Sequence, residues 1–343
     1  MSISASRPEK QSRLLSVIIP CHNVARWLGR CLDETFTSLP NDGEVIAVDD
    51  GSTDATANIL FEYALSEPRI RVIRQTCKGV SAARNAGLDA AKGKYIFFID
   101  ADDGVEPDFF SAMLEKMEEK AADYCLCAMR ERDDLGAKFR DSKLKGSYDF
   151  GSNVEIVEKY LPRIFGYSFD DVKAWYAGAP LFSKRELASV CRAAFKRDII
   201  EEYKIRFDES IVYFEDAMFN AEYLLHCEMM TCIDLPLYRV TVRDSSAQHT
   251  IPQDKPRYAA NKLRLLECRK RIDGIVEGRL TMQFQATNVL SAMEIMRIGR
   301  FEELNLFLKD PVVKNAFKGF PISFKHPLIA ITYIVLKIWK TFL

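Results

Sequence analysis

The sequence lacks several patterns that would assign it to common protein classes. Its nine cysteines form no Cys-x-x-Cys pair and only four histidines accompany them, which argues against a zinc site and favours small buried thiols in a reducing compartment. Residues 1–13 hold no apolar core, so we expect a flexible N-terminus, no secretory signal and a cytoplasmic location. The net charge of −1 gives no reason to expect nucleic-acid binding.

Long apolar runs are also missing from the last segment of the chain. Its longest uncharged apolar stretch, residues 328–336, is shorter than the about 20 residues that a membrane-spanning helix needs. Charge nevertheless divides the chain. Residues 254–343 carry 16 Lys and Arg against 8 Asp and Glu, a net of +8, which leaves −9 for residues 1–253. The lysines interleaved with apolar residues and Trp339 in 327–343 predict a helix lying on the anionic inner face of a membrane. The alternative is a helix docked on the protein or on a second subunit of a homo-oligomer.

The first hundred residues alternate short apolar runs with segments of helical spacing. The apolar runs at 15–19, 45–48, 70–73 and 95–99 predict four strands. Continuous apolar strands that alternate with helices are typical of a parallel α/β sheet covered on both faces. Further along, we expect a charged loop at 131–150 and helices throughout 255–308.

Polar or acidic clusters follow three of these four strands. They are Cys21-His22-Asn23, Asp49-Asp50-Gly51-Ser52 and Asp100-Ala101-Asp102-Asp103. Ligands bind beyond the carboxyl ends of parallel strands, so the three clusters should converge. Adjacent carboxylates raise one another's pKa unless a cation offsets them, and Mg²⁺ is typically held by carboxylates together with substrate phosphates. The pattern therefore predicts a site for a metal ion and a phosphate-bearing ligand.

In their order and spacing these motifs resemble those of the family 2 glycosyltransferases of the GT-A fold. The resemblance covers about residues 14–250 and rests on segments 16–23, 48–54, 78–87 and 100–103 and on Glu215-Asp216. It implies a GT-A domain at 14–250, with a Rossmann-like, mixed and mainly parallel sheet and flanking helices; residues 251–343 would form a helical C-terminal extension. It also implies an inverting, metal-dependent transferase that moves a sugar from a nucleotide-sugar, UDP-linked, to a hydroxyl of a glycan or lipid-linked saccharide in surface polysaccharide synthesis.

The resemblance further implies roles for single residues. Asp102 would be the direct ligand of Mn²⁺ or Mg²⁺, and Asp216 the general base that takes the proton from the acceptor hydroxyl. The residues expected beside the nucleotide are Pro20, His22, Asn23, Asp50, Arg84 and Asp100. The candidates for diphosphate or acceptor contacts are Glu215, Arg239, Arg243 and Ser245. Trp175 lies in an aromatic segment that fits a substrate-facing loop and a core position equally well.

Structural alternatives accompany these roles. His22, which stands where the family often has a stacking Tyr, fits an ordinary polar loop, and Glu215-Asp216 fits a helix N-terminus whose dipole favours acids. Arg239 fits a structural ion pair. The family often carries an aromatic and a Lys in the segment aligned with 190–197, where this chain has Cys191-Arg192-Ala193-Ala194-Phe195.

Two other functions compete with glycosyl transfer. A sugar nucleotidyltransferase would show a Gly-rich loop with Arg and Lys after the first strand, which residues 20–23 lack. A catalytically silent glycan-binding or scaffold protein would have no need to keep Asp50, Asp102 and Asp216 together. The sequence names neither the sugar nor the acceptor, and it assigns no role to Asp103.

Overall fold

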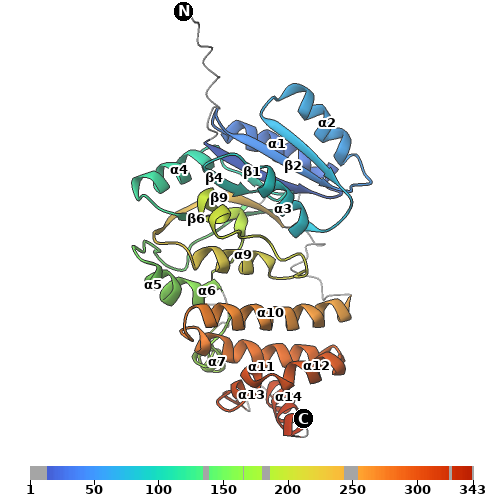
Figure 1. Ribbon diagram of the computed structural model, residues 1–343, viewed down its shortest axis with the longest axis vertical. Helices are drawn as coiled ribbons and strands as arrows, with labels where there is room; N and C mark the ends of the chain where they lie inside the picture. The colour runs from blue at the N-terminus through green and yellow to red at the C-terminus, as the bar shows by residue number, and fades with distance from the viewer. Residues whose placement is uncertain are drawn as a thin grey trace, which may run out of the picture.

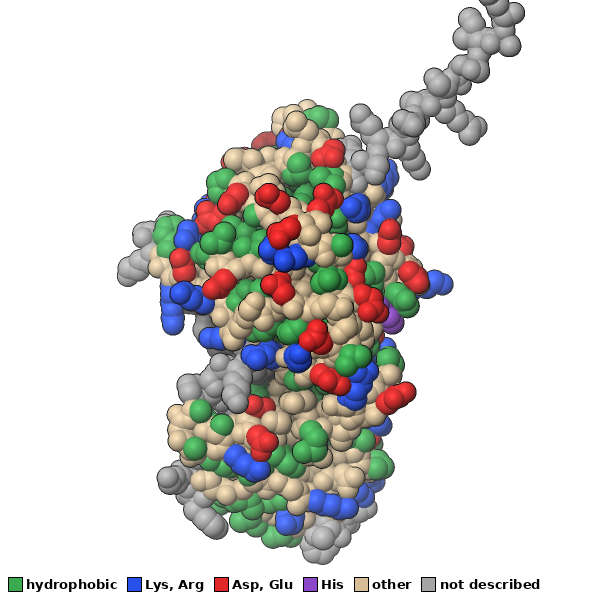
Figure 2. Space-filling view, turned by 90° about the vertical axis from the view of Figure 1, so that its left-hand side faces the viewer, with side chains coloured by type: hydrophobic (Ala, Val, Ile, Leu, Met, Phe, Trp, Pro, Cys, Tyr) green, Lys and Arg blue, Asp and Glu red, His purple; other side chains and the backbone are tan. Residues whose placement is uncertain are grey.

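The computed structural model describes residues 14–133, 139–164, 166–179, 186–242, 254–323 and 327–341. A sheet with flanking helices forms one end of an elongated molecule, and a stack of helices forms the other (Figure 1). Acidic side chains gather over the sheet end on the face shown in Figure 2, and basic ones are prominent toward the helical end. This distribution follows the opposite net charges of residues 1–253 and 254–343.

The sheet has nine strands and mixed direction, which confirms the predicted fold class. The order is β3-β2-β1-β4-β8-β6-β9-β5, with β7 paired to β6. The four predicted strands lie together and parallel as β3-β2-β1-β4, while β8 is antiparallel to both β4 and β6. The strands are β1 (Leu15–Cys21), β2 (Glu44–Asp50), β3 (Ile70–Gln75), β4 (Tyr95–Phe98), β5 (Gly104–Val105), β6 (Tyr124–Asp133), β7 (Phe139–Ser142), β8 (Ala193–Lys196) and β9 (Met230–Val242).

Helices flank this sheet, and their apolar stripes explain why. In α1, for example, the buried side chains Leu28, Cys31, Leu32 and Thr35 recur at helical spacing. Helix α3 packs on β1 and β2, and α4 packs on β6 and β9. The helices are α1 (Ala25–Ser38), α2 (Thr56–Ser66), α3 (Val80–Ala90), α4 (Phe109–Glu119), α5 (Asn153–Glu155), α6 (Leu161–Ile164), α8 (Arg197–Glu202) and α9 (Glu215–Leu224).

A second hydrophobic core lies in the helical stack. Its helices are α7 (Phe169–Tyr176), α10 (Lys255–Ile275), α11 (Thr281–Arg297), α12 (Phe301–Lys309), α13 (Pro311–Ala316) and α14 (Pro327–Thr341). Helix α10 serves both cores, because Leu265 and Ile272 face the core of the sheet end and Ala259 and Leu266 face the second core. The predicted division at residue 250 stays a prediction, since residues 243–253 lie outside the described ranges.

The expected loop at 131–150 is wrong in part. Residues 131–133 complete β6, and residues 139–142 form β7 antiparallel to it. The charge of Asp141 pairs between these two strands, with its Oδ1 2.6 Å from Arg130 Nε of β6. Opposite charges at facing positions stabilise a pair of antiparallel strands. The polarity of a segment taken alone does not reveal such pairing between strands.

Candidate active site

Asp50, at the end of β2, holds the segment that follows β3. Its Oδ1 accepts hydrogen bonds from Gln75 Nε2 and from the Lys78 amide, both at 2.8 Å, and its Oδ2 accepts from the Gly79 amide at 2.8 Å. The carboxylate is buried, with 3% of the residue exposed. Oδ2, which accepts one bond, still has a lone-pair site beyond it. Asp50 therefore fixes the shape of this edge of the sheet while its Oδ2 remains able to accept from a ligand.

His22 and Asn23, at the end of β1, contact the same region. His22 Nδ1 lies 2.8 Å from the backbone oxygen of Asp50; because a carbonyl only accepts, Nδ1 carries the proton in this arrangement. Asn23 Oδ1 accepts from the Thr53 amide at 2.8 Å and from the Asp54 amide at 3.3 Å. The ends of β1 and β2 thus hold each other. Pro20 lies within β1 itself, partly buried.

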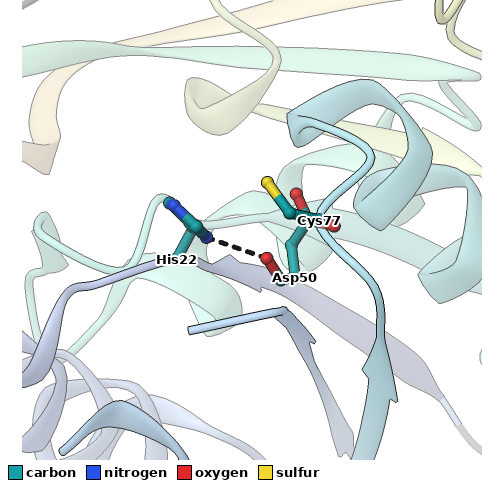
Figure 3. Close-up of side chains that lie close together, drawn as sticks. All are labelled: His22, Asp50 and Cys77. Carbon is teal, nitrogen blue, oxygen red and sulfur yellow. Dashed lines mark hydrogen bonds between the residues drawn. The ribbon is translucent and has the colours of Figure 1, made fainter. Parts of the chain in front are cut away.

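An exposed thiol completes this edge of the sheet. The imidazole of His22, the carboxylate of Asp50 and the thiol of Cys77 have ligand atoms within 4.8 Å of one another (Figure 3). Gly51, at φ +69°, comes so close to the Cys77 amide that a Cβ there would lie 2.7 Å from its nitrogen. Of the cysteines, only Cys77 is exposed.

Cys77 therefore reports on occupation of the predicted nucleotide site. We expect UDP at roughly ten times its Kd to slow alkylation of Cys77 by iodoacetamide about tenfold, because only the unbound fraction reacts. Peptide mass spectrometry measures the rate, and the half-buried Cys232 of β9 is the internal control. Equal rates for Cys77 with and without UDP would remove His22, Asp50 and Cys77 from the nucleotide site.

The acidic run after β4 divides into one buried and two partly exposed carboxylates. Asp103 is buried and accepts hydrogen bonds from Tyr238 Oη at 2.8 Å and from the Thr241 amide at 2.7 Å. Burial, followed by the charges of Asp102 and Asp100, raises the pKa of Asp103 well above its usual range. Asp103 thus ties the run to β9 and supports its neighbours from inside the fold.

Arg84, the fifth residue of α3, joins the acidic run to α9. Its Nη2 lies 2.9 Å from Asp100 Oδ1, and its Nη1 lies 2.7 Å from Asp216 Oδ1 and 3.4 Å from Glu215 Oε1. The guanidinium is buried and also lies over the Phe207 ring, 5.2 Å from its centroid. One cation therefore holds carboxylates from two distant segments at one place.

Asp216 and Glu215 lie in the first turn of α9. Asp216 Oδ2 accepts a bond from the Val190 amide at 3.3 Å. Burial raises the pKa of Asp216, and the nearby Arg84 charge opposes this rise only in part. Burial and the charge of Asp216 raise the pKa of Glu215 to about 7. Asp216 has 23% of its side chain exposed, so it remains accessible to a substrate proton.

The residues at the end of β4 fit a divalent cation. Asp100 has 38% of its side chain exposed, and Asp102 is also partly exposed. They offer hard oxygen donors, the type that Mg²⁺ and Mn²⁺ prefer. Burial is the main cause of the raised pKa of Asp103, and the charges of Asp102 and Asp100 raise it further. A cation at Asp100 and Asp102 would offset these two charges.

Other predicted site residues lie elsewhere. Arg239 Nη2 lies 3.1 Å from Glu34 Oε2, and the guanidinium also donates to the Val105 carbonyl, an arrangement that matches the structural alternative. Trp175 belongs to α7, where it stacks on Tyr176 and packs against the second core. Figure 1 places α7 at the helical end, away from α3 and β4. Arg243 and Ser245 lie outside the described residues.

Three contributors to this site are not marked by any motif in the sequence. The Val190 amide and Cys77 carry no pattern of their own, although Cys77 directly precedes the Lys78–Gly87 motif. Asn261 of α10, which holds the segment before α9, lies outside the motifs altogether. Only the folded chain brings these groups near Asp50 and the segment that leads into Asp216.

Comparison with known sequences gives the same family. The model described as "Glycosyl transferase family 2" matches residues 16–173. The uncharacterized glycosyltransferase EpsJ of Bacillus subtilis is 29% identical over 225 residues, which are 66% of this chain and 60% of EpsJ. Chondroitin synthase of Escherichia coli is 35% identical over 117 residues, 34% of this chain and 17% of that protein. The chain thus matches less than two thirds of the length of either relative.

Solved structures share the fold. Residues 1–349 of Staphylococcus aureus TarS, in a complex with UDP-GlcNAc, superpose with a TM-score of 0.59 at 16% identity, covering 95% of this chain and 90% of that one. The Pyrobaculum calidifontis mannosyltransferase PcManGT, in complex with GDP-Man and Mn²⁺, gives 0.50 at 15% identity, covering 95% and 87%. The family model thus assigns residues 16–173 to the family 2 glycosyltransferases, and the solved structures show the GT-A-like fold.

Proposed function

We propose that this protein is an inverting glycosyltransferase that moves a sugar from a UDP-sugar to a hydroxyl of a glycan or lipid-linked saccharide in surface polysaccharide synthesis. The observation that carries the proposal is the Arg84 bridge, because it sets the acidic run after β4 and the Glu215-Asp216 pair around one guanidinium. The UDP-GlcNAc complex of TarS and the name of chondroitin synthase support the donor and the polymer product.

In this proposal each group acts on a different part of the reaction. The edge formed by His22 and Asp50 receives the nucleotide base, and Asp50 accepts its imide N–H. Asp216 takes the proton from the acceptor hydroxyl as the oxygen attacks C1 on the face opposite the leaving diphosphate. This geometry inverts the configuration at C1. Asp102, with Asp100 in support, would hold Mn²⁺ or Mg²⁺, which when bound supplies positive charge to the diphosphate.

A product assay tests the proposal against the nucleotidyltransferase alternative. The purified chain is incubated with a panel of UDP-sugars, Mn²⁺ and lipid-linked or oligosaccharide acceptors, and UDP release and glycan mass are measured. The proposal expects UDP together with an extended glycan. Pyrophosphate released from UTP and a sugar 1-phosphate, with no UDP-sugar turnover, would replace it with nucleotidyl transfer.

We also propose that α14 contacts the anionic inner face of a membrane. Among the described residues, no helix combines the length and the apolar character needed to cross a bilayer. Helix α14 is docked by one face, where Tyr333 and Leu336 are buried, while Leu328, Ile331 and Ile338 are 80%, 58% and 56% exposed. Burial, followed by the charges of Lys318, Lys314 and Lys337, lowers the pKa of Lys340, so basic groups cluster beside this helix.

Vesicle binding tests the contact. We expect the variant Ile331→Asp/Ile338→Asp to lose roughly tenfold or more of its affinity for phosphatidylglycerol vesicles, because each Asp removes an apolar group worth about 1.5–3 kcal/mol when buried. Co-sedimentation measures the bound fraction. Ile275→Asp is the matched control, since Ile275 is similarly exposed, at 52%, on α10. Unchanged binding of the double variant would leave α14 as a docked helix only.

A further inference from the structure

The segment that leads into α9 has a strained backbone next to the proposed base. Phe214, immediately before Glu215-Asp216, has φ 70° and ψ 20°, the left-handed conformation that residues with a Cβ avoid. Its carbonyl accepts the bond from the Met218 amide that starts the helix. Such strain persists only where surrounding contacts over-determine the conformation. The position of Asp216 thus depends on whatever holds residues 211–214.

Asn261 of α10 holds this segment. Its Oδ1 accepts from the Val212 amide at 2.7 Å and from the Tyr213 amide at 3.3 Å, and its Nδ2 donates to the Tyr213 carbonyl at 3.2 Å. Only 1% of Asn261 is exposed. Both ends of the amide are therefore used, which fixes its orientation and leaves little freedom to the three peptide groups that it binds.

Neighbouring residues of α10 strengthen this contact. The Tyr258 ring packs edge-on against the Tyr213 ring, 5.6 Å between centroids, and Lys262 Nζ lies 5.3 Å from the centroid of the Phe214 ring. Lys262 Nζ in turn lies 2.6 Å from Glu294 Oε2 of α11. Figure 1 shows α10 running alongside α9, between the sheet end and the remaining helices. The helical stack thus reaches the turn before Asp216.

We propose that Asn261 is a positioning residue for glycosyl transfer, through which the C-terminal helices set the place of the Asp216 carboxylate. The inference rests on the proposed function for the role of Asp216. It gives the region beyond residue 250 a part in the reaction itself. Arg84 and the Val190 amide hold the carboxylate directly, and Asn261 holds the backbone that presents it.

Two variants of Asn261 separate positioning from general stability. Asn261→Leu keeps the number and branching of the side-chain heavy atoms and removes all three hydrogen bonds. We expect kcat to fall about tenfold to 100-fold, as for a catalytic group displaced by about 1 Å, while the Kd for UDP stays within about twofold. Asn261→Asp keeps the acceptor oxygen and should recover part of kcat. Asn288→Leu is the control, because Asn288 of α11 is equally buried and its side chain has no hydrogen-bond partner among the described residues; kcat should not change.

The backbone strain at Phe214 allows a second test of the proposal. Glycine adopts φ 70° without strain, so Phe214→Gly should reduce the loss of kcat caused by Asn261→Leu when the two are combined. Additive effects of the two changes, an unchanged kcat in folded Asn261→Leu, or a parallel loss of UDP affinity would each overturn the proposal.

Hydrogen exchange of the amides at 212–216 gives a readout that needs no activity. Faster exchange there in Asn261→Leu than in Asn288→Leu is expected, and equal exchange would overturn the positioning role. Should the wild-type chain transfer no sugar from any donor, the proposed function fails. The exchange result still decides whether Asn261 holds this segment.

Discussion

Replacing Asp216 with Asn is expected to lower kcat by on the order of 10²- to 10⁴-fold, the range that a positioned general base contributes. The amide cannot take the acceptor proton. Asp50, which is proposed to accept from the nucleotide base, ends β2 and holds the segment after β3, so the Kd for UDP, measured by calorimetry, should change by no more than a few-fold. The amide oxygen can still accept a bond from Arg84, which keeps the bridge in place.

Glu215→Gln is the matched control for this prediction. Glu215 shares the first turn of α9, but its Oε1 lies 3.4 Å from Arg84 Nη1, whereas Asp216 Oδ1 lies 2.7 Å from the same atom. We expect it to lower kcat much less. Loss of UDP binding in Asp216→Asn would make Asp216 a structural helix cap. Equal losses of kcat in both variants would reassign the base to the pair.

Replacing Asp102 with Asn should remove metal-dependent turnover. A cation that neutralises a leaving diphosphate contributes several kcal/mol, so a loss of kcat/KM on the order of 10³-fold is expected. Titration with Mn²⁺ in the presence of UDP, followed by calorimetry, should show metal-dependent nucleotide binding in the wild type and little of it in the variant. Turnover that keeps its Mn²⁺ dependence would move the ligand to another residue.

The variant Asp103→Asn separates the structural role of Asp103 from metal binding by Asp102. Asp103 accepts bonds from Tyr238 and Thr241 inside the fold, so its replacement should lower the thermal unfolding midpoint while leaving Mn²⁺ dependence in place. An Asp103 variant that is as stable as the wild type but no longer responds to Mn²⁺ would make Asp103 the metal ligand instead of Asp102.

Arg84 shows how a motif residue acquires its partners. The resemblance implies a place beside the nucleotide, and that role stays a prediction. The structure adds the bridge to Asp100 and Asp216, residues that lie 16 and 132 positions away in the chain. Nothing in the local sequence of α3 encodes the second partner, because it depends on how α9 docks against the sheet.

Three further residues illustrate the same limit. Asp103 has the same local context as Asp102 in the sequence, but the turn after β4 buries one and leaves the other partly exposed. Arg239 finds Glu34 only because β9 passes near α1. Trp175 lies in an aromatic segment that the fold assigns to the helical stack.

The sequence by itself determined the parallel strands, their order of appearance and the convergence of their polar ends, because apolar periodicity fixes local structure and parallel pairing puts successive carboxyl ends on one edge. Its motifs determined the family. Only the tertiary structure decided which carboxylates share Arg84, which member of the acidic run is buried, and that Asn261 of the C-terminal helices holds the turn before Asp216. These depend on contacts between segments far apart in the chain, which no local pattern records.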